Sequence, residues 1–209
     1  MNVLIADDHA IVREGIKQFL IGMGNVNNVQ EASDGNEALS KIENEKYDFV
    51  VLDISMPGMS GLDILQELKI KDEDAHILIL SMHPEEQYAV RALKLGASGY
   101  LCKDSVYEEL AEAIEIISKG GRYITASLAK KVTMDKIENK LPYPHENLSD
   151  REFQVMLLIA EGKSLKEISE ELCLSDKTIS TYRTRILEKM DMSNNAEIIR
   201  YAINNKLIE

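Results

Sequence analysis

The sequence has 209 residues, of which 44% are hydrophobic, so it is long enough for one large domain or two small ones. Its formal net charge of −12 at pH 7 argues against a uniformly basic nucleic-acid-binding surface. No stretch approaches the roughly 18–20 apolar residues of a membrane span, and the acidic N-terminus does not resemble a signal peptide. We therefore expect a cytoplasmic protein with no membrane partner, in which Cys102 and Cys173 are buried thiols rather than a disulfide.

Residues 1–120 alternate between short apolar runs and helical patterns. The apolar runs predict five strands, over Val3–Ala6, Val29–Ala32, Phe49–Leu52, Ile77–Ser81 and Gly99–Cys102. The segments between and after them predict five helices, over Ala10–Leu20, Asn36–Glu43, Leu62–Lys71, Glu85–Leu95 and Val106–Ser118. Several strands are apolar throughout, as expected where both faces of a parallel sheet are covered. The pattern predicts an α/β fold with a doubly wound, five-stranded parallel sheet.

A linker, partly helical, is expected over residues 121–147. Ala126–Asn139 has the composition of a lysine-rich helix, and Pro142 and Pro144 would end it. We expect this segment to tether two domains without fixing their relative orientation.

Residues 148–209 show no strand pattern and predict an all-α domain of four helices. Ser149–Glu152 and Ser164–Glu167 are capping boxes, which are typical of the first turn of a helix. The later helices are predicted over Lys177–Met190 and Asn195–Asn204. The second and third helices, with the short turn between them, have the lengths of a helix-turn-helix.

Polar side chains follow four of the five predicted strands at the point where each strand ends. They are Asp7, Asp8, Asp53, Ser81 and Lys103. A single Asp after a strand is a common turn residue. Because the carboxyl ends of parallel strands open onto the same crevice, however, five such residues are expected to lie close together.

Three carboxylates at close range favour a hard divalent cation, and Mg²⁺ commonly takes one or two carboxylates together with a phosphate. An Asp beside such an ion is a competent nucleophile toward phosphorus. Lys103 would neutralise the phosphoryl oxygens, and Ser81 would donate a hydrogen bond to them. The sequence has no P-loop, so nucleotide binding is not expected.

Four segments resemble the receiver domain of two-component response regulators in their order and spacing: LIADDH, VVLDISMPGMSG, LILSMH and GASGYLCKD. The resemblance implies a flavodoxin-like fold with Asp53 as the phosphoacceptor and Lys103 as the lysine that contacts the phosphoryl group. Ser81 and Tyr100 would be the switch residues. The implied ligands of Mg²⁺ are Asp7, Asp8, Asp53 and the backbone carbonyl of Ser55.

The third helix of the second domain has an apolar and a polar face. Ile179, Tyr182, Ile186 and Met190 share the face that is expected to pack inward. Lysine and arginine supply charge to phosphates, and serine and threonine reach base edges or phosphates. The candidate DNA contacts are Lys177, Thr178, Ser180, Thr181, Arg183, Thr184, Arg185 and Lys189. A solvated face of an ordinary amphipathic helix would look similar in isolation.

The run from Leu148 to Met190 resembles the LuxR-type output domain of the NarL/FixJ subfamily, a likeness that extends over Asn147–Glu209. It implies that the helix matching Lys177–Lys189 enters the major groove and that the helix matching Asn195–Asn204 mediates dimerisation. Lysines that are frequent in relatives at the positions of Ser180 and Thr184 are absent. We therefore expect a shallow salt dependence, with phosphate contacts from Lys177, Arg183, Arg185 and Lys189.

The two resemblances imply a transcription regulator that a sensor histidine kinase or a small phosphodonor phosphorylates at Asp53. Phosphorylation would free the helix-turn-helix and favour a homodimer on promoter double-stranded DNA, with RNA polymerase as a further partner. Catalysis would be limited to the protein's own phosphorylation and dephosphorylation. Two alternatives stay open: a constitutive DNA-binding dimer with a non-switching receiver, and a metal-dependent phosphatase. Against the latter, Ser55 stands where such enzymes use a second carboxylate.

Overall fold

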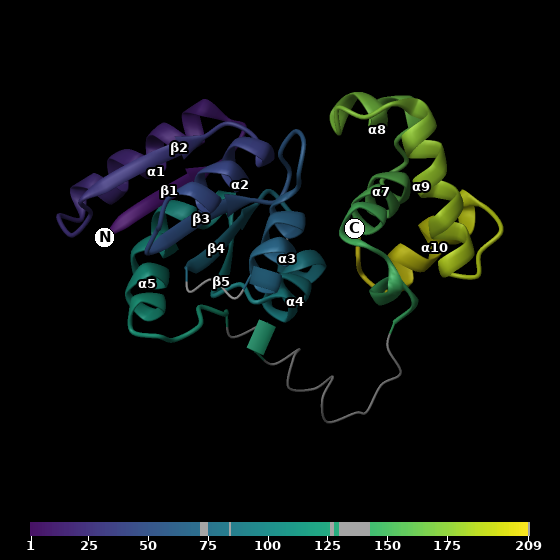
Figure 1. Ribbon diagram of the computed structural model, residues 1–209. Coiled ribbons are helices and arrows are strands. Elements are labelled where there is room, and N and C mark those ends of the chain that lie inside the picture. Colours follow the sequence, from purple (N-terminus) through teal and green to yellow (C-terminus); the bar gives the residue numbers. More distant parts are fainter. Residues whose placement is uncertain (72–74, 84, 126–127, 130–142, 209) are drawn as a thin grey trace. The chain divides into compact units, whose positions relative to one another are not determined.

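The structure is a computed structural model that describes residues 1–71, 75–83, 85–125, 128–129 and 143–208. The chain forms two compact units, Met1–Ile137 and Glu138–Glu209 (Figure 1). The predicted class, an α/β unit followed by an all-α unit, is confirmed.

The first unit contains a five-stranded, all-parallel sheet with the strand order β2-β1-β3-β4-β5. Each predicted strand lies within one residue of the observed bounds. The strands are β1 (Asn2–Ala6), β2 (Asn28–Ala32), β3 (Phe49–Asp53), β4 (His76–Ser81) and β5 (Gly99–Cys102). This order places the topological switch point between β1 and β3, because the chain leaves β1 for β2 on one side and β3 for β4 on the other.

Helices cover both faces of this sheet, which explains why its central strands are apolar throughout. The helices are α1 (Ala10–Gly22), α2 (Gly35–Asn44), α3 (Gly61–Lys71), α4 (Glu85–Leu95) and α5 (Val106–Ser118). Ile16 of α1 and Ile114 of α5 belong to one buried cluster with Val3, Val51 and Leu80 from three strands. The sequence periodicity therefore predicted the positions of these five helices correctly.

The register of the strands aligns the residues that follow them. Ala6 pairs with Leu52, so Asp7 and Asp53 come next to each other along the sheet. Asp53 in turn pairs with Leu80. The polar residues at the ends of neighbouring strands are thereby brought to one edge.

After α5 the chain returns to the edge of the sheet at Tyr123. Tyr123 forms a parallel bridge with Gly99, and its backbone N–H donates to the carbonyl of Ser98 at 2.8 Å. The helix expected over Ala126–Asn139, and Pro142 with it, lie outside the described residues except at positions 128–129. The domain boundaries after residues 120 and 147 stay predictions.

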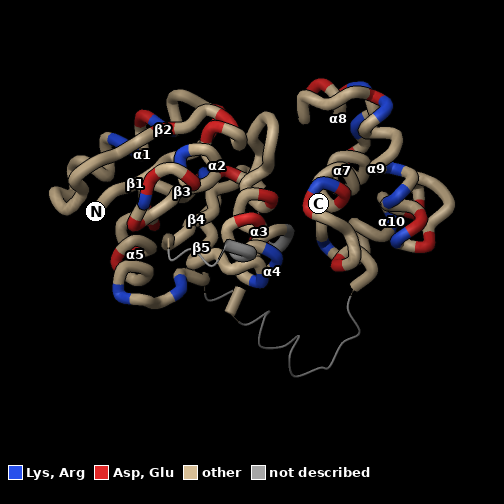
Figure 2. Tube along the Cα trace, viewed as in Figure 1, with Lys and Arg blue, Asp and Glu red and all other residues tan. Residues whose placement is uncertain are grey.

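The second unit is entirely helical in its described part. Its elements are the 3₁₀ turn η2 (Pro144–Asn147) and the helices α7 (Asp150–Ala160), α8 (Leu165–Glu171), α9 (Asp176–Lys189) and α10 (Asn195–Asn204). Both predicted capping boxes are present, at Ser149 with Glu152 and at Ser164 with Glu167. Basic residues recur along α9 (Figure 2). No helix in the described residues is long and apolar enough to cross a membrane.

The cysteines differ from the expectation in their burial. Both are free thiols, as predicted, but Cys102 is only half-buried and Cys173 is exposed. Cys173 has a φ of 52° in the turn that follows α8, and a residue in such a surface turn has little apolar structure around it. The prediction that both thiols are buried was wrong because it used local apolar composition alone.

The charge of Glu37 in the first turn of α2 is expected to stabilise the first unit. The Glu37 carboxylate accepts hydrogen bonds from Ser33 N at 2.8 Å and Lys41 Nζ at 2.8 Å. The Lys41 ammonium, with the help of Ser33, lowers the pKa of Glu37 to about 2. A lowered carboxyl pKa contributes stability that is complete above about pH 4.5 and is lost as the pH falls toward 2.

Glu37→Gln should therefore lower the free energy of unfolding by about 1 kcal/mol at pH 7, a value reduced for the partial exposure of the carboxylate. The difference from wild type should shrink as the pH falls from 4.5 toward 2. Denaturant unfolding at several pH values measures it, with Glu67→Gln on the exposed part of α3 as the control. A difference that does not depend on pH would contradict this role of the charge.

Candidate functional site

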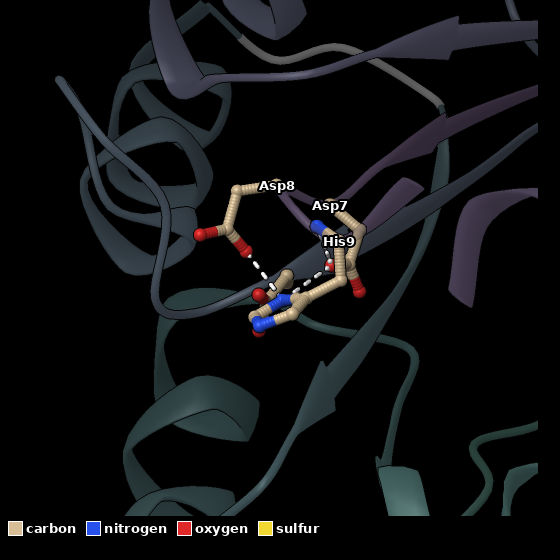
Figure 3. A group of neighbouring side chains, drawn as sticks. Asp7, Asp8 and His9 are labelled. Carbon is tan, nitrogen blue, oxygen red and sulfur yellow. Dashed lines mark hydrogen bonds and ion pairs between the residues drawn. The ribbon is translucent and has the colours of Figure 1, made fainter. Parts of the chain in front are cut away.

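The edge of the sheet at the switch point contains a compact acidic cluster. One ligand atom from each of Asp7, Asp8, His9 and Asp53 lies within 4.8 Å of all the others. Figure 3 shows Asp7, Asp8 and His9 following one another in the loop after β1. The structure thus brings together the three carboxylates that sequence reasoning placed at this edge.

The cluster has a buried inner part and an exposed outer part. Asp7 and Asp53 are 0% and 2% exposed, whereas Asp8 and His9 are exposed. Burial raises the pKa of Asp53 to about 6, although the ammonium of Lys103 acts in the opposite direction. Removing this carboxylate from water is unfavourable to its charged form, so a cation bound beside it would offset part of this penalty.

Lys103 lies between the two buried carboxylates. Its Nζ is 2.8 Å from Oδ2 of Asp53 and 2.7 Å from Oδ2 of Asp7. Burial would lower the pKa of Lys103, but the charges of Asp53 and Asp7 outweigh it and raise the pKa. The residue therefore remains an ammonium ion that neutralises part of the negative charge.

His9 was missed by sequence reasoning. Its Nδ1 lies 2.7 Å from Oδ1 of Asp8 and 3.2 Å from Oδ1 of Asp7. Its position directly after two acidic residues and before α1 was the available signal. The donor set is nevertheless dominated by carboxylate oxygens, the ligands that Mg²⁺ prefers, and the residues present fit that ion.

The loop after β3 folds back over Asp53, and glycines permit this path. Ser55 donates its backbone N–H to Oδ1 of Asp53 at 3.3 Å. Gly58 has a φ of +77°, which an L-residue with a side chain rarely adopts. A Cβ at Gly61 would lie 2.2 Å from the backbone oxygen of Asp53. The proline and glycines that end the strand therefore shape the surroundings of its terminal carboxylate.

Ser81 and Tyr100 meet at the backbone of His83. The Oγ of Ser81 accepts a hydrogen bond from His83 N at 3.0 Å, and the hydroxyl of Tyr100 donates to His83 O at 2.8 Å. Tyr100 is 2% exposed, and burial raises the pKa of its hydroxyl. The tyrosine ring thus lies inside the unit.

Helix α9 presents a polar face without bulky apolar side chains. The exposed residues on it include Lys177, Ser180, Thr181, Thr184 and Arg185, whereas Ile179, Ile186 and Met190 are buried. The two threonine hydroxyls donate to the helix backbone one turn earlier, at 2.9 and 3.1 Å. The two cations are therefore the prominent charged groups of this face.

The remaining predicted DNA contacts have partners within the second unit. Arg183 Nε donates to Oδ1 of Asn195 at 2.6 Å. Lys189 Nζ lies 2.6 Å from Oε2 of Glu152, a carboxylate with only 3% exposure. The Thr178 hydroxyl lies 2.8 Å from that of Ser175. Arg183 and Lys189 thus link α9 to α10 and α7, whereas Thr178 contacts the N-cap residue of α9 itself. The contacts of all three residues with DNA stay predictions.

Two family models match the chain. The model described as "Response regulator receiver domain" matches residues 3–115. The model described as "Bacterial regulatory proteins, luxR family" matches residues 146–202. The first covers the unit with the acidic cluster, and the second covers the unit with α9.

Curated relatives match over nearly the whole chain. The response regulator UvrY of Escherichia coli K12 is 36% identical over 208 residues, which are 99% of this chain and 95% of the relative. The response regulator GacA of Pseudomonas viridiflava is 33% identical over 210 residues, with 100% and 98% of the two chains covered.

Solved structures of RcsB are also similar. RcsB of Salmonella enterica serovar Typhimurium, bound to promoter rprA in the presence of the phosphomimetic BeF3−, matches with a TM-score of 0.65 and 27% identity over 96% of this chain and 97% of that one. An RcsB–DNA complex matches with a TM-score of 0.60 and 28% identity over 96% of each chain. On these matches, the chain belongs to the NarL/FixJ-family response regulators of two-component systems, with a receiver domain followed by a LuxR-type helix-turn-helix DNA-binding domain.

Proposed function

We propose that phosphorylation of Asp53 controls DNA binding and dimerisation by this transcription regulator. One observation above all supports the proposal: Asp53 ends a buried strand with the ammonium of Lys103 at 2.8 Å and the carboxylates of Asp7 and Asp8 beside it. A carboxylate with a fixed cation and further acidic ligands is suited to attack on phosphorus.

In the proposed reaction an oxygen of Asp53 forms a bond to the phosphorus of the donor. With a kinase phosphohistidine, the P–N bond breaks, and the imidazole leaves with the electron pair and takes a proton from solvent. With acetyl phosphate, the P–O bond breaks and acetate leaves with the electron pair as the anion. Mg²⁺ would be bound by Asp7, Asp8, Asp53 and the backbone carbonyl of Ser55, and when bound it neutralises charge on the phosphoryl oxygens. Lys103 neutralises charge from the other side.

The new charge would redistribute the contacts of the switch residues. A phosphoryl group brings a charge of about −1.5 to −2, and Lys103 is already shared between two carboxylates. We infer that Lys103 and the Ser81 hydroxyl turn toward the phosphoryl oxygens. The Ser81 contact to His83 would then change, and Tyr100, bound to the same backbone, would transmit the change to the surface near α4 and α5.

The output is binding of promoter double-stranded DNA by α9, with a homodimer as the active form. The similar RcsB structures include complexes with DNA and dimers of that protein. In this chain, Lys177 and Arg185 on the exposed face would contact phosphates, and α10, on which Ile203 is 52% exposed, would pair two copies. A sensor histidine kinase and RNA polymerase complete the proposed partners.

A constitutive DNA-binding dimer is the second candidate, because the Tyr100 ring is buried in this structure. A phosphatase activity on small substrates is less well supported. The residue two positions after Asp53 is Ser55, which cannot act as the carboxylic acid that such a reaction needs.

Acetyl phosphate with Mg²⁺ should strengthen DNA binding by the wild type and not by Asp53→Ala. The reason is that only the wild type can form the aspartyl phosphate. Gel-shift titration of a selected duplex, with and without acetyl phosphate, measures the two affinities. Equal affinities in all four samples would overturn the proposal and favour the constitutive dimer.

Asp53→Asn should stabilise the metal-free protein at pH 7. Because the pKa of Asp53 is raised to about 6, the folded protein is stabilised by binding a proton at this carboxyl group at low pH. This stabilisation is lost as the pH rises through 6. Removing the buried charge should raise the free energy of unfolding by about 1–3 kcal/mol at pH 7 in EDTA. The gain should disappear below about pH 4.

Unfolding experiments at several pH values test this, with the exposed Asp104→Asn as the control. Saturating Mg²⁺ should stabilise the wild type more than Asp53→Asn and reduce the difference between them. An Asp53→Asn variant that is no more stable than wild type at pH 7 would show that burial does not penalise this carboxylate.

Arg185→Ala and Lys189→Ala should differ in what they damage. Arg185→Ala should weaken DNA binding with little change in stability. In a plot of the logarithm of the DNA-binding constant against the logarithm of the salt concentration, it should make the slope shallower by about one for each copy bound. The wild-type dimer should itself show a slope of about −4 with phosphate contacts from Lys177 and Arg185 of each copy, and a steeper slope would indicate that Arg183 and Lys189 also contact phosphates. Titrations at several salt concentrations measure these slopes.

Lys189→Ala should instead lower the free energy of unfolding of the second unit by about 1–3 kcal/mol, because it removes the cation beside the buried Glu152. Thermal or denaturant unfolding detects this loss. The reverse pattern, with Lys189→Ala affecting only DNA binding, would show that its contact with Glu152 contributes little.

A further inference from the structure

The loop between β1 and α1 provides two of the proposed metal ligands, so its backbone conformation determines where they lie. His9 N donates to Oδ1 of Asp7 at 2.8 Å, and Asp7 N donates to the carbonyl of Ala32 at 3.2 Å. The carbonyl oxygen of Asp7, in the peptide group that joins it to Asp8, accepts a hydrogen bond from Nη1 of Arg13 at 2.6 Å. Arg13 therefore binds the peptide group between the two acidic residues.

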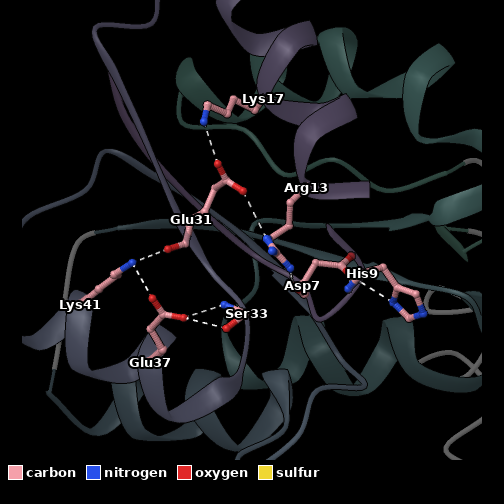
Figure 4. A network of polar contacts seen from close by, with 8 residues as sticks. All are labelled: Asp7, His9, Arg13, Lys17, Glu31, Ser33, Glu37 and Lys41. Carbon is pink, nitrogen blue, oxygen red and sulfur yellow. Dashed lines mark hydrogen bonds and ion pairs between the residues drawn. The ribbon is translucent and has the colours of Figure 1, made fainter. Parts of the chain in front are cut away.

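Arg13 is itself fixed by a carboxylate on the neighbouring strand (Figure 4). Its Nε donates to Oε2 of Glu31 at 3.3 Å, and its side chain is only 14% exposed. Lys17, one turn further along α1, donates to the other oxygen of Glu31 at 2.7 Å. Hydrogen bonds from Lys17 and then Arg13 lower the pKa of Glu31 against the effect of burial, so this anchor is ionised.

The two acidic residues of the loop depend on Arg13 to different degrees. The Asp7 side chain is buried and is also paired with Lys103. The Asp8 side chain is 31% exposed and pairs with His9, a residue of the same loop before α1. The direction of the Asp8 carboxylate is thus determined mainly by the peptide group that Arg13 binds.

We propose that Arg13, oriented by Glu31, is a positioning residue for Mg²⁺ binding that fixes the Asp7–Asp8 peptide group and so places the Asp8 carboxylate. The inference rests on the metal site of the proposed function. Mg²⁺ requires nearly octahedral ligand geometry with distances of about 2.0–2.1 Å. Outer partners that orient metal ligands typically change metal affinity by about 10–100-fold.

The sign of the effect separates positioning from simple electrostatics. Arg13 is a cation close to a cation-binding site, so its charge alone would repel Mg²⁺. If charge were its only influence, removing it would strengthen Mg²⁺ binding. If it positions Asp8, removing it weakens binding despite the loss of that repulsion.

The chain offers a matched control for this test. Lys17 has the same charge as Arg13, lies on the same helix and contacts the same Glu31 carboxylate. Unlike Arg13, it donates to Glu31 and not to the backbone of the acidic loop. The dissociation constant of Mg²⁺ is measured on the full chain from the rise in Tm with Mg²⁺ concentration. Arg13→Gln should raise this constant about tenfold, whereas Lys17→Gln should leave it unchanged or lower it slightly.

A kinetic measurement distinguishes positioning from general damage to the fold. In phosphorylation by acetyl phosphate, Arg13→Gln should raise the Mg²⁺ concentration needed for half of the maximal rate, with the rate at saturating Mg²⁺ retained. Glu31→Gln should show a smaller change in the same direction. If Arg13→Gln fails to fold, Arg13→Lys, which keeps the charge but loses the forked donor, should show the weakened Mg²⁺ binding.

An Mg²⁺ affinity in Arg13→Gln that equals or exceeds that of the wild type would overturn the inference and leave the proposed metal site intact. The same weakening in Lys17→Gln as in Arg13→Gln would also overturn it. A wild-type chain whose Tm does not respond to Mg²⁺ would overturn the metal site itself, and the role of Arg13 with it.

Discussion

The ammonium of Lys103, shared between the buried carboxylates of Asp7 and Asp53, is the interaction on which the receiver unit depends. Two carboxylates at the ends of adjacent strands would repel each other, and neither is well solvated. The lysine compensates for part of this cost, but the pKa of Asp53 is still raised to about 6. The site is therefore unfavourable for its own negative charge and correspondingly favourable for further cations.

The ion pairs of Lys103 with Asp7 and Asp53 also connect the site to the rest of the unit. A phosphoryl group would compete with Asp7 and Asp53 for the same lysine, so the existing ion pairs would have to change. Ser81 and Tyr100 both bind the backbone of His83, at the end of β4 and near the start of α4. A change at the carboxylates can thus reach the surface through hydrogen bonds and close packing, without any large movement of the sheet.

The helix-turn-helix unit uses some of its charges in contacts between helices and leaves others exposed. Glu152 serves both in the capping box of α7 and as the partner of Lys189, while Arg183 binds Asn195 at the start of α10. These contacts orient α9 on the other helices. Lys177 and Arg185 remain exposed on its polar face. If α9 is the recognition helix, as proposed, its modest positive charge would confine the attraction to DNA to one limited surface of an acidic chain.

Local patterns in the sequence were sufficient for the helices, the strands to within one residue, and the capping boxes, because periodicity and caps depend on neighbouring residues. They also placed Asp7, Asp8 and Asp53 together, since parallel strands end at a common edge. Only the tertiary structure decided which charges pair: Arg13 meets Glu31 across 18 residues, and Lys189 meets Glu152 across 37. Such pairs depend on how elements pack, and a local pattern contains no information on the side chain that a distant strand or helix presents.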